Sequence, residues 1–186
     1  MNDVIKAIVE RRSIRKYKPD PIAEKDRDLI LKAGLHAPSA KNTQSWHILA
    51  VQKPDIIDRI TDEVKAALLR AKIDKYKALA ENPNYRVNFG AAPLFTIVSA
   101  ASAQTSCPAE DCSCVLENMF LAAHSLGIGS CWVNQLGCIS DEPAFRRFIT
   151  ELGVPADNTI YGSAAFGYAD AQTKLPPRKE NTVTII

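Results

Sequence analysis

The 186-residue sequence predicts a mixed helix-and-strand protein in which helices cover both faces of a sheet. Segments with helical spacing of apolar residues alternate with short apolar segments that are typical of strands. With 46% hydrophobic and 24% charged residues, the chain can bury a substantial core. No repeat, linker or low-complexity tract interrupts it, so we expect a single domain over residues 1–186. Periodicity alone does not give the strand order.

The first half of the chain is expected to hold three helices and a strand. Pro54 opens the last of these helices, and the Glu-Asn-Pro-Asn segment at 81–84 ends it. In order, the elements are a helix at 2–12 with the apolar stripe Val4, Ile5, Ile8 and Val9; a helix at 24–35 with Leu29, Ile30 and Ala33 facing inward; a strand at 46–52; and a helix at 55–79.

The second half alternates strands and helices more regularly. The helix there carries apolar residues at helical spacing and ends at Gly127. In order, the elements are a strand at 93–101, a helix at 110–126, a strand at 130–134, a short helix at 141–152, a strand at 159–168 and a final strand at 182–186.

The final strand follows a charged, proline-containing segment that reads as an extended arm over residues 168–186. An apolar strand on such an arm needs a sheet edge to join, and a partner subunit can supply one. We therefore expect the arm to be exchanged in a dimer.

Composition excludes several classes of protein. A net charge of +2 is too small to indicate nucleic-acid binding, and the least charged stretch, residues 89–104, is short for a membrane span. The N-terminus does not resemble a signal peptide, so a cytoplasmic location is expected. Cys107, Cys112 and Cys114 could form a metal or iron–sulfur site, but small, partly buried thiols explain them better because their spacing matches no common ligand pattern.

The first candidate binding segment is the basic run at 11–17, which begins at the end of a helix. Arg11, Arg12, Ser13 and Arg15 could bind a phosphate, because guanidinium groups bind its oxygens in pairs and a hydroxyl adds a neutral donor. Taken by itself, this run is better explained as a solvated basic helix end, which the helix dipole favours.

Two further segments could bind a flat heteroaromatic ring. The loop at 38–45, here called the amide loop, carries Asn42 and Gln44, whose amides offer both donors and acceptors. It could also be a plain polar loop, with Trp46 as a core anchor. In residues 127–137, glycines allow a planar ligand to approach the backbone closely. The Gly-x-Gly there is not a dinucleotide fingerprint, because it follows a helix and precedes a strand.

Together, four blocks in this order resemble the FMN-dependent nitroreductase family over nearly the whole chain. The blocks are R-R-S-I-R-K-Y near the start, A-P-S-A-K-N-T-Q-S-W before the first strand, L-G-I-G-S-C-W-V in mid-chain, and G-Y followed by P-P-R-K near the end. The resemblance implies an α+β fold of three α/β/α layers. Its central antiparallel sheet would be extended by the partner's C-terminal strand.

The resemblance also implies a homodimer with FMN at the subunit interface. Arg11, Ser13 and Arg15 would hold the phosphate, with Arg12 beside them and Arg178 or Lys179 closing from the arm. The ring edge would be contacted by one of Asn84, Arg86 and Asn88. The remaining expected cofactor-binding residues are Pro38, Ser39, Ala40, Asn42 and Gln44 from the other subunit, and Asn134, Gln135 and Gly137 near the reactive flavin nitrogen.

The expected function is oxidation of NADH or NADPH with transfer of electrons through FMN to small oxidised acceptors, such as nitroaromatics or quinones, in ping-pong order. No side chain is expected to act as a catalytic acid, base or nucleophile. The alternatives are a flavin storage, sensor or ferredoxin-fed protein without nicotinamide activity, and the metal protein considered above. We expect no nucleic-acid or membrane partner.

Overall fold

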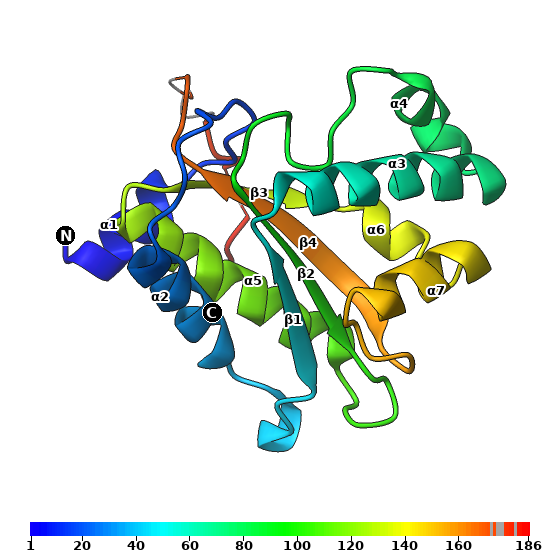
Figure 1. Cartoon of the computed structure of the whole chain (residues 1–186). Coiled ribbons are helices and arrows are strands. Elements are labelled where there is room, and N and C mark those ends of the chain that lie inside the picture. The colour runs from blue at the N-terminus through cyan, green and yellow to red at the C-terminus, as the bar shows by residue number, and fades with distance from the viewer. Residues whose placement is uncertain (172, 174–176, 181) are drawn as a thin grey trace.

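The computed structural model describes residues 1–171, 173, 177–180 and 182–186. At its centre is a four-stranded sheet in the order β1-β2-β4-β3, in which every neighbouring pair is antiparallel (Figure 1). The strands are β1 (Trp46–Val51), β2 (Leu94–Ala100), β3 (Gly129–Val133) and β4 (Thr159–Gly167).

Helices cover both faces of this sheet, as the sequence predicts (Figure 1). On one face, α2 (Glu24–Leu35) and α5 (Pro108–Ser125) pack against the sheet, and α1 (Asp3–Glu10) lies against α5. The other carries α3 (Pro54–Arg70), α4 (Lys77–Glu81), α6 (Gln135–Cys138) and α7 (Pro143–Glu151). Two short 3-10 turns, η1 (Ala40–Asn42) and η2 (Asp74–Tyr76), complete the elements. The predicted three-layer antiparallel fold is confirmed.

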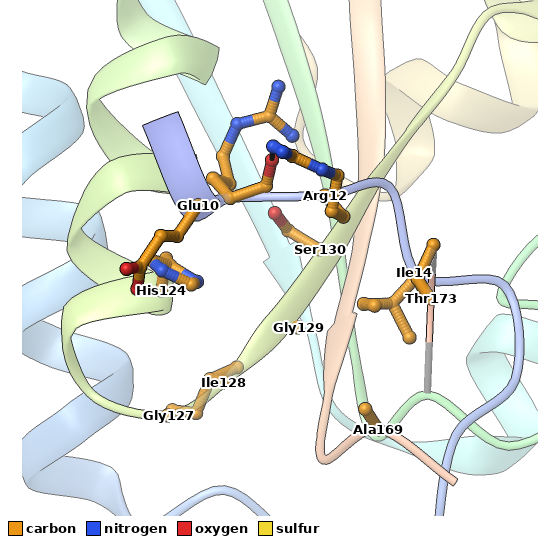
Figure 2. Close-up of a pocket in the computed structure, with 11 residues that line it drawn as sticks. Glu10, Arg12, Ile14, His124, Gly127, Ile128, Gly129, Ser130, Ala169 and Thr173 are labelled. Atoms are coloured by element: carbon orange, nitrogen blue, oxygen red, sulfur yellow. Dashed lines mark hydrogen bonds between the residues drawn. The ribbon is translucent and has the colours of Figure 1, made fainter. Parts of the chain in front are cut away.

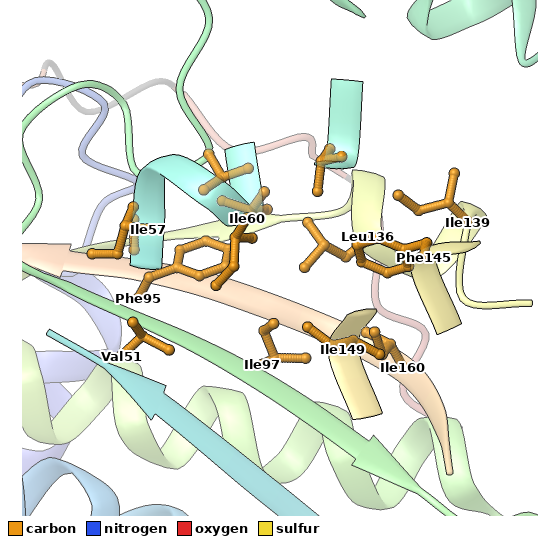
Figure 3. Packing of buried hydrophobic residues seen from close by; sticks show 14 of the residues in the cluster. Val51, Ile57, Ile60, Phe95, Ile97, Leu136, Ile139, Phe145, Ile149 and Ile160 are labelled. Atoms are coloured by element: carbon orange, nitrogen blue, oxygen red, sulfur yellow. The ribbon is translucent and has the colours of Figure 1, made fainter. Parts of the chain in front are cut away.

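The core consists of two apolar clusters, one on each face of the sheet. Phe95 and Ile97 of β2 pack under α3, α6 and α7 (Figure 3). Leu94 and Val98 pack against α2 and α5 on the other face. All seven residues of β2 are buried because helices cover both of its faces and strands lie on both of its edges. Among the described residues, no helix is long and apolar enough to cross a membrane.

Three details of the helices differ from the prediction. The helix expected at 55–79 ends at Arg70, and Lys72 has a left-handed backbone (φ 51°) that no glycine or proline marks. Leu29 of α2 is 42% exposed, because the buried stripe runs through Ile30 and Gly34 instead. The four-residue α6 was not predicted, since a single turn is too short to show periodicity.

The expected strand at 182–186 is not formed within this chain. Its residues have no regular secondary structure, and Val183 and Ile185 are exposed. At the root of the preceding arm, Tyr17 pairs with Ala169 and the Asp170 N–H donates to the Lys16 carbonyl. A strand needs a neighbour to bond to, and within the described residues this segment pairs with neither edge strand of its own sheet.

Candidate functional site

The basic segment and the amide loop lie at opposite ends of the sheet. Ser13 forms a β-bridge to Ser130, which lies opposite Phe166 near the end of β4. The amide loop leads into Trp46, which aligns through Ala100 with Thr159 at the start of β4. The nine residues of β4 span about 25 Å, and Figure 1 shows η1 far from the segment that follows α1. One small ligand therefore cannot touch both segments of the same chain.

At the first of these ends, the segment after α1 carries Arg11, Ser13 and Arg15, here called the phosphate cluster, and their charges and hydroxyl act on the Cys131 thiol. Burial raises the pKa of the Cys131 thiol, while Arg15, a hydrogen bond with Ser13, and Arg11 act in the opposite direction. The three residues expected to bind phosphate thus occupy alternate positions of one extended segment at this end of the sheet.

Arg11 and Arg12 make different contacts despite being neighbours. The Arg11 guanidinium lies 5.5 Å from the centre of the Phe120 ring and 3.6 Å from the Glu117 carboxylate. Arg12 donates to the carbonyls of Val9 (2.7 Å) and Arg11 at the end of α1. Arg12 therefore supplies hydrogen-bond donors to carbonyls at the end of α1, as expected if this run is a basic helix end. Its Nε is buried and has no hydrogen-bond partner among the described residues.

Beside these arginines is a pocket of about 290 Å³, lined by residues that include Arg11, Arg12, His124 and Ser130 (Figure 2). Ser130 is 1% exposed, and its hydroxyl has no hydrogen-bond partner among the described residues. A buried unpartnered hydroxyl is unfavourable unless a ligand or water satisfies it. Ser130 was not among the expected site residues, although it belongs to the G-I-G-S block that pointed to this region.

The glycines of that block serve the protein's own packing. Gly127 ends α5 with a left-handed backbone (φ 73°). A Cβ on Gly129 would come within 2.7 Å of the Ile14 side chain. At Gly129, a side chain is therefore excluded by the packing of Ile14.

At the other end of the sheet, the amide loop is tightly folded. The Ser39 hydroxyl accepts the Gln44 N–H (3.0 Å), and the Gln44 amide donates to the Asn42 side chain (3.1 Å). Pro38 and Asn42 are exposed, and Ala40 is half-buried. The Ala40 N–H donates to Asp111, a buried residue that sequence reasoning missed because 71 positions separate the two.

The third group of expected site residues begins α6. Asn134 is exposed, whereas Gln135 and Gly137 are half-buried. The Gln135 Oε1 is buried and has no hydrogen-bond partner among the described residues. Leu136 between them is fully buried in the core and fixes the turn. The start of α6 therefore lies at the surface and carries one hydrogen-bond acceptor, the Gln135 Oε1, that needs a donor.

Within the described residues, the remaining candidates make no hydrogen bond or ion pair with the phosphate cluster or the amide loop. Arg178 and Lys179 are exposed on a segment without regular structure, and residues 174–176 of the same block lie outside the described residues. Asn84 is exposed, Arg86 faces Asp58, and the Asn88 amide donates to the Ala92 carbonyl. The geometry does not choose among these last three.

The cysteines near the start of α5 are free thiols in the described part of the chain. Cys112 is fully buried, and burial raises its pKa to about 12, which disfavours the thiolate that a metal requires. Within the described residues, no group of three or more His, Cys, Asp or Glu side chains is placed to hold a metal ion.

Comparison with known proteins agrees with the fold and the motif blocks. The model of the nitroreductase family matches residues 8–168. The chain is 37% identical to an FMN reductase of Bacillus subtilis that is named as using NAD(P)H, over 98% of this chain and 73% of that one. Among solved structures, a nitroreductase with bound FMN from Bacteroides fragilis superposes with a TM-score of 0.94 at 37% identity, covering all of both chains. A second FMN-bound nitroreductase, from Desulfitobacterium hafniense, gives 0.86 at 25% identity, covering 100% of this chain and 99% of that one.

Proposed function

The chain belongs to the nitroreductase family and is an FMN-dependent NAD(P)H oxidoreductase, and from this premise we propose that it reduces small oxidised acceptors, such as nitroaromatics or quinones, in ping-pong order. The observation that carries the proposal is that Arg11 lines the same pocket as Ser130, to which Ser13 forms a β-bridge. The buried Ser130 hydroxyl has no hydrogen-bond partner among the described residues.

The residues present fit FMN. The phosphate cluster offers two guanidinium groups and a hydroxyl, which suit the terminal phosphate. The amide loop and the start of α6 offer mixed donors and acceptors, which suit the polar edge of an isoalloxazine ring. The buried Oε1 of Gln135 is an acceptor that lacks a partner until such a ring supplies one.

The proposed site is shared between two copies of the chain. Because the phosphate cluster and the amide loop of one chain lie about 25 Å apart along β4, a single FMN meets both only if the loop comes from a second copy. Pro38, Ser39, Ala40, Asn42 and Gln44 would then face the partner's phosphate cluster. The exposed segment at 182–186, with Arg178 and Lys179 before it, would cross to the partner as the C-terminal arm.

In this mechanism the protein binds and orients, and its side chains transfer no protons. Bound FMN supplies the redox chemistry, taking electrons from a reduced nicotinamide and giving them to the acceptor. The phosphate cluster would anchor one end of the cofactor, and the backbone at the start of α6 would support the reacting edge. The nicotinamide and the acceptor use one binding place in turn, which is the origin of the ping-pong order.

The first test is the visible absorption spectrum of the purified chain, before and after anaerobic addition of NADH or NADPH. Flavin bands that bleach on addition are the expected result, followed by parallel double-reciprocal lines with menadione as acceptor. Bands that persist would indicate a storage, sensor or ferredoxin-fed flavoprotein instead. Absence of flavin even after reconstitution with FMN would overturn the proposal, and intersecting lines would contradict the ping-pong order.

A further inference from the structure

The amide loop holds a backbone conformation that its residues do not favour. Lys41, Asn42 and Gln44 have φ angles of 52°, 55° and 49°, in the left-handed region that glycine adopts most readily. Such a conformation persists only where neighbouring contacts determine it. Besides the hydrogen bonds within the loop, one anchor lies outside its own residues.

Asp111 provides that anchor. One carboxylate oxygen accepts the Ala40 N–H at 2.9 Å, and the other accepts the Thr105 hydroxyl at 2.8 Å. The Thr105 oxygen in turn accepts the Cys107 N–H at 3.2 Å. For the described part of the chain, the Asp111–Ala40 contact is the only hydrogen bond between residues 38–44 and another element.

The position of Asp111 suits this task. It is 4% exposed and lies in the first turn of α5, where the helix dipole favours a carboxylate. Two donors satisfy its two oxygens, so the carboxylate is fixed and its bond to Ala40 is charge-assisted. The loop is thereby held before any ligand arrives, which lowers the conformational entropy lost on binding.

We propose that Asp111 is a positioning residue of the flavin site, acting through Ala40 on the loop that the partner's FMN contacts. The inference rests on the proposed function, because it requires the loop to face FMN. Asp111 itself touches no cofactor in this arrangement. Its effect is therefore expected in the FMN site of the partner subunit.

The direct test is the FMN dissociation constant of Asp111→Ala, measured by flavin fluorescence after removal and re-addition of FMN to the full chain. We expect binding about tenfold weaker or more, since a hydrogen bond to a charged group is lost. Glu110→Ala is the matched control, because Glu110 is an exposed carboxylate in the same turn, and its dissociation constant should stay within about twofold.

Asp111→Asn provides a second variant, because it keeps the shape and one acceptor oxygen. It should bind FMN with intermediate affinity, and it carries the test if Asp111→Ala does not fold. Wild-type affinity in the variant that folds would overturn the inference.

Mixed dimers separate positioning from general loss of structure. One chain carries Asp111→Ala and the other Arg15→Ala, which is chosen because Arg15 is exposed whereas Arg11 packs on Phe120. If Asp111 acts on the partner's site, both lesions fall in the same site and the other site is intact. We therefore expect one FMN per mixed dimer to bind with wild-type affinity.

The other outcomes are distinct. A mixed dimer without any wild-type site would overturn the inference, because Asp111 would then act within its own chain. Wild-type FMN affinity in the Arg15→Ala homodimer would contradict the phosphate assignment of the proposed function, and the inference would then be decided by Asp111→Ala alone. A wild-type chain that binds no FMN would overturn both.

Discussion

Among single residues, the basic segment shows that neighbouring arginines have separate tasks. Arg12 bonds to the carbonyls that end α1, whereas Arg11 packs on Phe120 beside Glu117. The motif predicted that these residues lie together, because their order along the chain is visible in the sequence. It could not predict which guanidinium the helix end would use, since that depends on where α1 stops. The sequence could not identify Asp111 as a contact of the amide loop either, because Ala40 lies near it only in the folded chain.

Replacing Arg11 by alanine should weaken FMN binding about tenfold or more, because a charge-assisted bond to phosphate is lost. The measurement is the dissociation constant from a flavin fluorescence titration. Lys16→Ala is the control, since it removes the same charge from the same segment and Lys16 pairs with Asp170 at 3.1 Å. Equal affinities for the wild type and Arg11→Ala would remove Arg11 from the phosphate cluster.

At the scale of elements, an ion pair joins α3 to α7. Arg70, the last residue of α3, donates to both carboxylate oxygens of Glu142 at 3.1 and 2.8 Å. Glu142 also caps α7 by accepting the Phe145 N–H at 2.8 Å. The Arg70 hydrogen bond is the main reason that the pKa of Glu142 falls from 4.5 to about 2. This carboxylate therefore couples the end of one helix to the start of another.

Arg70→Gln should lower stability by about 1 kcal/mol at pH 7, the upper end for exposed ion pairs. Because the folded-state pKa of Glu142 is depressed, its stabilising contribution is present above pH 4.5 and is lost as the pH falls towards 2. The difference between wild type and variant should therefore shrink when urea unfolding is repeated from pH 7 down to pH 3.

Arg59→Gln on the same helix is the control for this experiment. Arg59 lies over the Phe148 ring and, within the described residues, pairs with no carboxylate. Its effect on stability should be the same at every pH. A pH-independent difference for Arg70→Gln as well would show that Glu142 is not the group responsible.

The elements also show where sequence patterns stop being informative. The bounds of α2 were predicted to the residue from the spacing of its apolar side chains. The break after Arg70 was not predicted, because Lys72 adopts its left-handed backbone without a glycine to indicate it. The orientation of Leu29 was misjudged because α5 packs over Gly34, where a Cβ would come within 2.8 Å of Met119. Tertiary contacts chose that face, and local spacing does not contain them.

The whole molecule leaves apolar surface exposed on α1 and on the C-terminal segment. Val4, Ile5, Ile8 and Val9 form the stripe that the sequence predicts, and each is 46–64% exposed. An amphipathic helix with its apolar side in water is typical of a surface that another protein covers. The exposed Val183 and Ile185 add a second such segment. Both fit the proposed homodimer.

The double variant Ile5→Glu/Ile8→Glu should convert the dimer to monomers, because two charges would be buried at the proposed interface. Sedimentation velocity gives the oligomeric state, and FMN content should fall with it. Leu69→Glu is the matched control, since Leu69 is an equally exposed apolar residue on α3, on the opposite face of the sheet. A double variant that remains dimeric would place the interface elsewhere.

The placement of the phosphate cluster and the amide loop at opposite ends of β4 also has a consequence for handling the protein. If neither chain alone can enclose the cofactor, cofactor binding and subunit association obey one mass-action equilibrium. Dilution of the protein should then release FMN, and excess FMN should hold the subunits together. The apparent affinity for FMN would therefore depend on protein concentration, and a weakly coloured preparation could regain its colour simply by being concentrated with added FMN.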